Sequence, residues 1–244
     1  MDKRTNINSL HLNYLTPLHK WRVMDVNSLR KECLRAPNYH NFCRVIRKLE
    51  KDKILEAYRD PYSRKKFVFL GPSGERLLSL KDNPTAISNE TVIHDLRVSE
   101  ITHRLYDSGL VDDVELEHEI NDKRNFRTIY KIIPDAILHL EKNGHMYKIA
   151  FELELNRKSN SRITEKMKQY EDSTFYNYAM YLFPTEKMME TYMKEAEKEL
   201  GSTSMSKFMF FCHPELSSGI HKPSEIKGVL QGKKITLDDV LRRN

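Results

Sequence analysis

The chain has 244 residues, of which 39% are hydrophobic and 31% are charged, and its formal net charge is +6. This length suits one large domain or two small ones, and so many charges are typical of domains with a large solvated surface. We find no apolar run of about 18 residues, no secretory signal and no lipidation motif, so we expect a cytoplasmic protein without a membrane partner. The three cysteines are odd in number and lack metal-ligand spacing, which favours free thiols in a reducing compartment.

The positive charge is concentrated in the first third of the chain. Residues 1–82 carry 18 Lys and Arg against 9 Asp and Glu, a net charge of +9, whereas the remaining residues carry 23 against 26, a net charge of −3. This asymmetry favours a polyanionic partner for the N-terminal part, most often nucleic acid. A merely soluble basic surface is the alternative.

The first expected elements in chain order are helices. Residues 1–14 are polar without a clear period and are expected to be partly disordered. Short helices are expected at 17–23 and at 25–34, the second with Asp25 as its N-cap. The clearest helix covers residues 39–51, where apolar side chains recur at helical spacing: Phe42, Val45, Ile46 and Leu49.

Two strands and a short helix are expected next. The strands, 54–59 and 66–70, flank a basic, proline-containing tip at 60–65, and the helix begins near Ser73. Three helices followed by a hairpin and a helix is the order of a winged helix-turn-helix, in which the third helix enters the major groove and the hairpin tip contacts the DNA backbone. We therefore predict a winged helix DNA-binding domain at residues 12–82. A winged helix used for protein contacts is the alternative.

In such a domain, the third helix and the hairpin tip supply the contacts to double-stranded DNA. Their cationic side chains would lie on phosphates, and the polar residues at the start of the helix would reach base edges. The residues that we assign to DNA binding are His40, Asn41, Arg44, Arg47, Lys48, Lys51, Arg64, Lys65 and Lys66.

A polar, proline-containing stretch at 81–89 is the expected linker to a second domain at 90–213. The elements expected after the linker are a helix, three strands, a helix, a strand, a helix and a strand, at 91–106, 111–120, 132–140, 147–155, 160–176, 178–183, 185–200 and 207–212. Residues 214–244 are rich in Gly, Ser and Lys and are expected to form a C-terminal tail with a short amphipathic end.

The two central strands of this second domain carry the main functional indication. They are joined through Asn143-Gly144, a strong hairpin turn. Glu152 and Glu154 fall on one face of the second strand because side chains alternate, and Asp135 on the neighbouring strand can point toward them. Three converging carboxylates repel one another, and a hard divalent cation such as Mg²⁺ or Mn²⁺ would compensate. Alternatively, the two glutamates only solvate an exposed sheet face.

This order of elements, with Pro-Asp on the second strand and an acidic pair on the third, resembles the PD-(D/E)XK nuclease superfamily. Pro134-Asp135 resembles the Pro-Asp of that family, and Glu152 resembles its acidic residue. Glu100, on the preceding helix, resembles an accessory acid that some members have. The chain departs from the pattern at Glu154, where the family usually has a lysine.

The resemblance implies a lysine that activates or orients the attacking water. We expect this charge from Lys166 on the following helix or from Lys148 on the same strand face. The predicted catalytic residues are Asp135, Glu152, Glu154 and Lys166, of which the three acids are the predicted metal ligands. Further residues close to the same face of the helix are possible accessory groups: Arg162, Gln169 and Tyr170.

A winged helix ahead of such a domain, with an acidic-x-acidic third strand, resembles the replication-relaxation family of plasmid and phage proteins, which includes the MobC-type mobilisation relaxases. The resemblance covers about residues 12–212. It implies an α/β (α+β) fold, with a winged helix-turn-helix followed by a restriction-endonuclease-like domain that has a mixed sheet. It also implies binding at a plasmid or phage DNA site and, in the MobC-like branch, metal-dependent nicking of a single strand by three acids.

The function that we expect is therefore metal-dependent nicking of DNA at a specific site, in plasmid mobilisation or replication initiation. The missing lysine motivates a second hypothesis, a catalytically inactive replication or transcription regulator whose nuclease-like domain forms a homodimer. A third hypothesis is an interaction protein that does not bind DNA. Because the sequence has no glycine-rich phosphate-binding loop, we expect no nucleotide cofactor.

Overall fold

The computed structural model describes residues 9–79, 87–88, 91–122, 132–216 and 222–242. By its internal contacts the chain divides into two units, residues 1–100 and 101–244, which are described separately below. Most of the expected linker at 81–89 lies outside the described residues. The chain is mixed α/β, as predicted. Within the described residues, no helix is long and apolar enough to cross a membrane.

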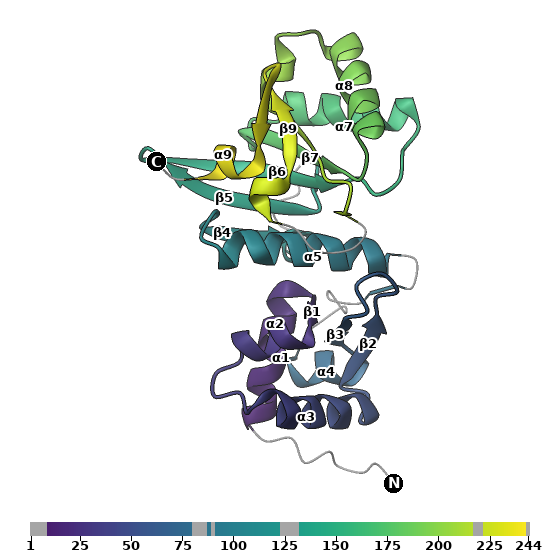
Figure 1. The fold of residues 1–244 in the computed structure, drawn as a ribbon, viewed down its shortest axis with the longest axis vertical. Helices are drawn as coiled ribbons and strands as arrows, with labels where there is room; N and C mark the ends of the chain where they lie inside the picture. The colour runs from purple at the N-terminus through teal and green to yellow at the C-terminus, as the bar shows by residue number, and fades with distance from the viewer. Residues whose placement is uncertain (1–8, 80–86, 89–90, 123–131, 217–221, 243–244) are drawn as a thin grey trace. The chain divides into compact units, whose positions relative to one another are not determined.

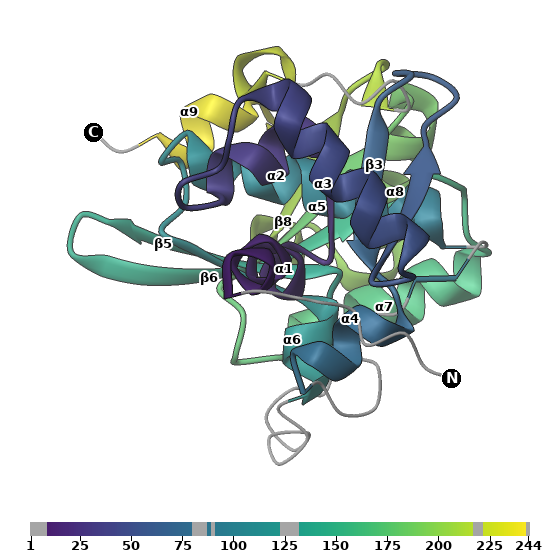
Figure 2. The same ribbon diagram turned by 90° about the horizontal axis from the view of Figure 1, so that it is seen from below.

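The first unit is built from short helices around a small antiparallel sheet (Figure 1). Its elements are α1 Ser9–Trp21, β1 Val23–Asp25, α2 Val26–Glu32, α3 Tyr39–Lys51, β2 Leu55–Arg59, β3 Lys66–Leu70, α4 Pro72–Leu77 and the first half of α5 Val92–Asp107. The sheet has the order β1-β3-β2, with antiparallel pairs throughout. Figure 2 shows α3 running beside the hairpin β2–β3, in agreement with the contacts between α3 and β2.

The start of the chain differs from the prediction. The described part of the segment expected to be disordered belongs to α1, which begins at Ser9 and continues through Pro17. One side of α1 is buried and makes up for the hydrogen bond that a proline removes from a helix: Tyr14, Leu15, Leu18 and Trp21. Val23–Asp25, expected at a helix boundary, is instead a strand paired with β3.

Helix α3 confirms the predicted range 39–51. The side chain of Asn38 caps it by accepting a hydrogen bond from the backbone N–H of Asn41. In the same way, Asp25 caps α2 through the backbone N–H groups of Asn27 and Ser28, as predicted. Both helices therefore begin where a short polar side chain satisfies amides that have no helical partner.

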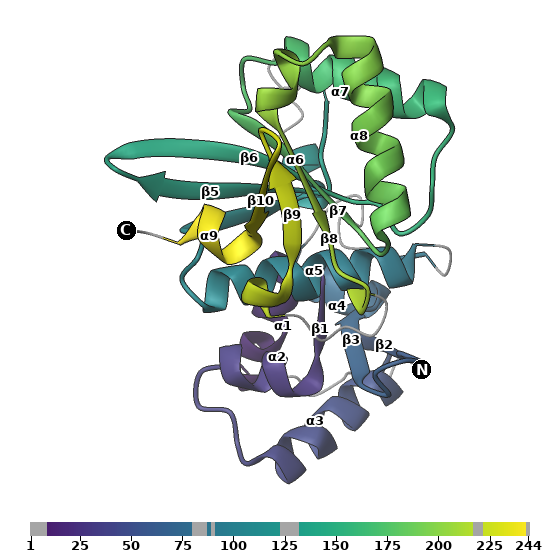
Figure 3. The ribbon, with the colours of Figure 1, turned by 45° about the horizontal axis from the view of Figure 1, so that its top comes forward.

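The second unit holds a larger sheet. Its elements are β4 Asp113–Leu116, α6 Glu117–Asp122, β5 Ala136–Lys142, β6 His145–Leu153, α7 Asn160–Asp172, β7 Tyr178–Phe183, α8 Glu186–Leu200, β8 Phe208–Cys212, β9 Lys227–Leu230, β10 Lys233–Thr236 and α9 Leu237–Leu241. Within the described residues seven strands form one sheet in the order β10-β9-β8-β7-β6-β5-β4, and β6, β7 and β8 are parallel. Figure 3 shows α7 and α8 on one face of this sheet.

The hairpin β5–β6 is the centre of this unit. Asn143 and Gly144 both have positive φ, 55° and 75°, which is the backbone of the predicted two-residue turn. The parallel strand β7 lies beside β6 and removes β6 from the sheet edge. An aromatic core fills the space between these strands and the helices α7 and α8, and it includes Ala150, Ile163, Met167, Tyr170, Tyr181, Phe183, Tyr192 and Phe210.

Two expectations for the second unit are wrong. The strand expected at 111–120 ends at Leu116, and the chain continues as helix α6. Residues 214–244 are not a separate tail, because β9 pairs with β8 and β10 pairs with β9. At Gly228 an added Cβ would lie 2.3 Å from the carbonyl oxygen of Phe210, so only glycine fits this close pairing. The glycine and lysine content that indicated a tail therefore belongs to two short strands.

Candidate functional site

The structure brings the three predicted acids together at one end of the hairpin β5–β6. Asp135 immediately precedes β5, Glu152 lies in β6, and Glu154 follows β6. The Asp135 Oδ2 atom accepts a hydrogen bond of 2.7 Å from the backbone N–H of Leu153, the residue between the two glutamates. The negative charge of Asp135 raises the pKa of both glutamates, which places all three carboxylates within electrostatic reach of one another. We call these three residues the carboxylate cluster.

Glu152 points toward α7 and is almost completely buried, with 1% of its surface exposed. The Lys166 Nζ atom lies 2.6 Å from its Oε2 atom, and the Tyr170 hydroxyl donates a hydrogen bond to its Oε1 atom. Lys166 and Tyr170 are one turn apart on α7, so a single helix face meets both oxygens of this carboxylate. A lysine from α7 thus stands beside the acid, whereas in the nuclease pattern the lysine comes from the strand itself.

Glu154 is also buried, with 4% of its surface exposed, and its main partner comes from helix α8. Its side chain is hydrogen-bonded to the hydroxyl of Tyr192 on α8, and the Lys158 Nζ atom lies 3.9 Å away. The backbone N–H of Glu154 donates to the carbonyl oxygen of Leu182 on β7. The alternative in which the two glutamates solvate an exposed sheet face is therefore wrong, since both lie under α7 and α8.

The electrostatics of the carboxylate cluster show a shortage of positive charge. Burial and the repulsion from Asp135 raise the pKa of Glu152 to about 8, although Lys166 and Tyr170 oppose this rise. Burial likewise raises the pKa of Glu154. Burial disfavours the charged form of Lys166 as well, but the three acids hold its pKa above the usual value. The site therefore keeps a cationic lysine and gains from any further positive charge.

These shifts predict that stability falls as the pH rises from about 5 to about 8. In this window the folded chain holds a proton on Glu152 that the unfolded chain, with the ordinary pKa of 4.5, has released. The free energy of unfolding should decrease by a few kcal/mol, as measured by urea denaturation at each pH in EDTA. Glu152→Gln should flatten this slope, while Glu165→Gln, an exposed carboxylate on α7, should leave it unchanged. An equal slope in Glu152→Gln would contradict the assignment to Glu152.

One buried hydroxyl beside the cluster was not anticipated from the sequence. Tyr181 on β7 is paired in register with Glu152, and its hydroxyl has no hydrogen-bond partner within the described part of the chain. Burial and the nearby acids raise the pKa of Tyr181 well above its usual value, so the hydroxyl keeps its proton. Tyr192, which contacts Glu154, was also missed, because the crossing of α8 over the sheet leaves no mark in the local sequence.

The residues of the cluster fit a hard divalent cation by their chemistry. The donors are all oxygen atoms, the carboxylates outnumber the adjacent lysine, and a buried hydroxyl without a partner faces them. As the side chains stand, the described residues contain no group of three His, Cys, Asp or Glu side chains placed to hold a metal ion. Both oxygens of Glu152 already accept hydrogen bonds, so binding would require a rearrangement of Lys166 or Tyr170.

The other predicted residues of the site are either exposed on α7 or directed away from the carboxylate cluster. Arg162 and Gln169 are exposed on α7, and Arg162 is one turn before Lys166. Lys148 does not join the carboxylate cluster, because its Nζ atom lies over the ring of Phe175, 4.1 Å from the ring centre. Of the two lysines considered for the missing charge, Lys166 is therefore the one beside the acids.

The first unit presents a cationic surface on α3. Its apolar side is buried through Phe42, Ile46 and Leu49. The polar residues assigned to DNA binding on this helix are all exposed: His40, Asn41, Arg44, Arg47, Lys48 and Lys51. We call these six residues the α3 face.

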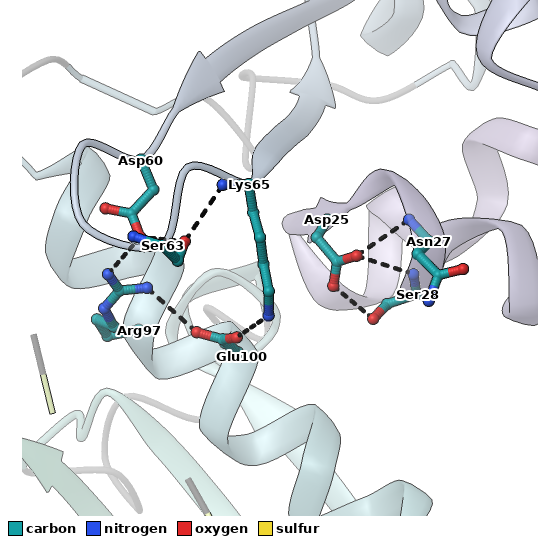
Figure 4. A network of polar contacts seen from close by, with 8 residues as sticks. All are labelled: Asp25, Asn27, Ser28, Asp60, Ser63, Lys65, Arg97 and Glu100. Carbon is teal, nitrogen blue, oxygen red and sulfur yellow. Dashed lines mark hydrogen bonds and ion pairs between the residues drawn. The ribbon is translucent and has the colours of Figure 1, made fainter. Parts of the chain in front are cut away.

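The tip of the hairpin β2–β3 is fastened by a buried ionic network (Figure 4). The Arg97 Nη2 atom lies 2.7 Å from Asp60 Oδ2, and its Nη1 atom lies 3.1 Å from Glu100 Oε2. Asp60 also accepts a hydrogen bond from the backbone N–H of Ser63. Burial alone would raise the pKa of Asp60, but the hydrogen bonds from Arg97 and Ser63 hold it below its usual value. The tip is thereby fixed to the start of α5.

Ion pairs at the hairpin β2–β3 change the interpretation of three predicted residues, Lys65, Lys66 and Glu100. The Lys65 Nζ atom lies 3.1 Å from Glu100 Oε1, and Lys66 forms an ion pair with Glu50. Glu100, expected as an accessory acid of the nuclease-like site, thus accepts hydrogen bonds from Lys65 and Arg97 of its own unit. Of the three cations assigned to DNA at the hairpin β2–β3, Arg64 is the exposed one.

Comparison with protein families identifies the chain. A family model described as replication-relaxation matches residues 15–179, more than half of the 244 residues. The matched range contains both the α3 face and the carboxylate cluster with Lys166. Neither the curated proteins nor the solved structures gave a match. As the sequence motifs predicted, the chain belongs to the replication-relaxation family, and this membership points to a role in plasmid replication or mobilisation.

Proposed function

We propose that the chain binds plasmid or phage DNA through a winged helix and nicks one strand at its carboxylate cluster, in the manner of MobC-type relaxases. The observation that carries this proposal is the contact of 2.6 Å between Lys166, which is half-buried, and the buried carboxylate of Glu152. It pairs a cation with clustered acids, a combination that can hold a metal ion and stabilise the negative charge of a phosphate under attack. Membership of the replication-relaxation family supports the role in plasmid replication or mobilisation.

Asp135, Glu152 and Glu154 would hold one or two Mg²⁺ or Mn²⁺ ions. When bound, such an ion would polarise the scissile phosphate and lower the pKa of a water molecule so that it attacks at neutral pH. The carboxylates of the cluster would orient that water and accept its proton. Because burial and mutual repulsion raise the pKa of Glu152, this carboxyl has an unusually high proton affinity for the task.

Cationic side chains next to the cluster would receive the phosphate. Lys166 touches the cluster, Lys158 lies 3.9 Å from Glu154, and Arg162 is exposed one turn before Lys166. Lys166 is half-buried, so its charge acts in a region of low dielectric, where it stabilises developing negative charge more strongly than in water. Arg162 and Lys158, at the surface, would hold the neighbouring phosphates of the strand.

DNA docking would use the α3 face and the hairpin tip of the first unit. In a winged helix the third helix lies in the major groove, and its first residues reach base edges. His40, Asn41 and Arg44 occupy that position, while Arg47, Lys48 and Lys51 would meet phosphates. Arg64 at the hairpin tip would contact the backbone beside the groove.

The test uses a supercoiled plasmid that carries the DNA surrounding the coding sequence. Purified protein with Mn²⁺ should convert it to open circles, and the same reaction with EDTA should not. Opening without linear product would assign the cut to one strand. Protein that binds this DNA in a mobility-shift assay, yet never opens it with Mn²⁺ or Mg²⁺, would contradict nicking.

A catalytically inactive regulator is the second candidate. It is favoured because both oxygens of Glu152 already accept hydrogen bonds from Lys166 and Tyr170, so neither is open to a metal ion. Under this alternative the second unit would serve for dimerisation, and the DNA would only be bound. Glu152→Ala separates the two: it should abolish plasmid opening in the nicking enzyme and should leave DNA binding and regulation intact in the regulator.

A further inference from the structure

Tyr181 lies directly beside the carboxylate cluster on the neighbouring strand. Residues Ala150, Phe151 and Glu152 of β6 pair in parallel register with residues 179–181 of β7, which places Tyr181 opposite Glu152. The side chain is 1% exposed and belongs to the core under α7 and α8. Because Tyr181 and Glu152 are partners on adjacent parallel strands, their side chains leave the sheet on the same face. Burial, together with the charges of Glu152, Glu154 and Asp135, raises the pKa of the Tyr181 hydroxyl.

The hydroxyl of Tyr181 differs from its neighbours in one respect. Tyr170 donates to Glu152, Tyr176 donates to the carbonyl oxygen of Ile132, and Tyr192 is bonded to Glu154. Within the described residues, the hydroxyl of Tyr181 has no hydrogen-bond partner. A buried hydroxyl without a partner loses its hydration and gains nothing in return, so a phenylalanine would be the better core residue.

Packing fixes where this hydroxyl points. The ring of Tyr181 stacks with Phe183 and Phe210, with ring centres 6.1 and 6.0 Å away. Tyr170 meets it edge-on at 6.3 Å. A ring held on several sides keeps its hydroxyl in one place before any ligand arrives, which lowers the cost of binding.

We propose that Tyr181 is a ligand-binding residue of the carboxylate site, and that its hydroxyl donates a hydrogen bond to an oxygen atom held there. That oxygen belongs either to a water molecule that enters with the divalent cation or to a phosphate group of the DNA. Both are oxygen acceptors drawn in by positive charge, and both would supply the partner that the hydroxyl lacks. This inference rests on the proposed function, because it requires that the cluster binds a cation.

The test compares Tyr181→Phe with the matched control Tyr176→Phe. The melting temperature of each protein is measured in EDTA, in a titration with Mn²⁺ alone, and in a titration with Mn²⁺ in the presence of a short single-stranded oligonucleotide. In EDTA, Tyr181→Phe should melt at or above the wild-type temperature, whereas Tyr176→Phe should melt lower because it loses its bond to Ile132.

The titrations identify the ligand. Tyr181→Phe should need about tenfold more Mn²⁺ for the half-maximal rise in melting temperature, and Tyr176→Phe should titrate as the wild type does. A shift with Mn²⁺ alone would assign the acceptor to water. A shift that appears only with the oligonucleotide would assign it to phosphate.

Two results would overturn the inference. Equal titrations of Tyr181→Phe and wild type, in both arms, would show that the hydroxyl meets no ligand, while the proposed metal site would stand. A lower melting temperature of Tyr181→Phe in EDTA would show that the hydroxyl has a partner within the protein. If Mn²⁺ fails to stabilise the wild type, the proposed function loses its metal and the inference falls with it.

Discussion

Asp135→Asn should abolish the rise in melting temperature that Mn²⁺ produces in the wild-type chain. The substitution removes one negative charge from the cluster, but its amide oxygen can still accept the hydrogen bond from the backbone N–H of Leu153. A cation at a concentration of about 100 times its Kd stabilises a folded protein by roughly 2.7 kcal/mol, and this gain should disappear. Opening of the supercoiled plasmid should fall by at least the roughly 10- to 100-fold that the loss of a supporting group of a metal site costs.

Asp112→Asn is the matched control for this substitution. Asp112 also accepts a backbone N–H, that of Glu141, at 2.7 Å, but it takes no part in the carboxylate cluster. The control should keep both the response to Mn²⁺ and plasmid opening. If Asp135→Asn retains the full rise in melting temperature, the cation does not bind where the three acids meet, and the regulator becomes the better explanation.

The parts of the fold that could be predicted are those whose evidence is local. Helix α3 combines an N-cap at Asn38 with an apolar stripe, and the hairpin β5–β6 has a turn that needs positive φ at Asn143 and Gly144. The failures have a common cause. Pro17 indicated a helix start but lies inside α1, where the burial of one helix side outweighs local preference. The composition of residues 214–244 hid two short strands, which form because their backbones pair with β8 and with each other.

The candidate site divides in the same way. The alternation of β6 placed Glu152 and Glu154 on one face, and the hairpin register brought Asp135 to them. The partners of these acids come from α7, β7 and α8, and only the three-dimensional fold decides which residue of each element meets the cluster. Lys166 was a candidate because of its charge, whereas Tyr181 and Tyr192 looked like ordinary core residues.

Long-range contacts also explain why the hairpin tip was only partly predicted. Basic residues in and beside the tip indicated three cations for DNA, yet Glu100 and Glu50, from other parts of the sequence, form ion pairs with Lys65 and Lys66. Glu100 also fastens the tip to α5, because Arg97 joins it to Asp60. Because the tip is already fastened, contact of Arg64 with DNA would need no further loss of entropy to order the loop.

The double substitution Arg44→Ala and Arg47→Ala should weaken DNA binding by roughly 100-fold at about 0.1 M salt. Both side chains are exposed on α3, so their loss removes charge without opening the core. Each lost phosphate contact should also lower the slope of log K against log salt by about one. Affinity is measured by fluorescence anisotropy on the labelled target duplex at several salt concentrations.

The control removes the same charge elsewhere. Lys187→Ala with Lys194→Ala takes two exposed cations from α8 of the second unit and should leave affinity and salt slope nearly unchanged. Equal losses in both double variants would mean that net charge, not the α3 face, attracts the DNA. Binding that survives Arg44→Ala with Arg47→Ala and ignores salt would favour the interaction protein without DNA, because phosphate contacts always release counterions.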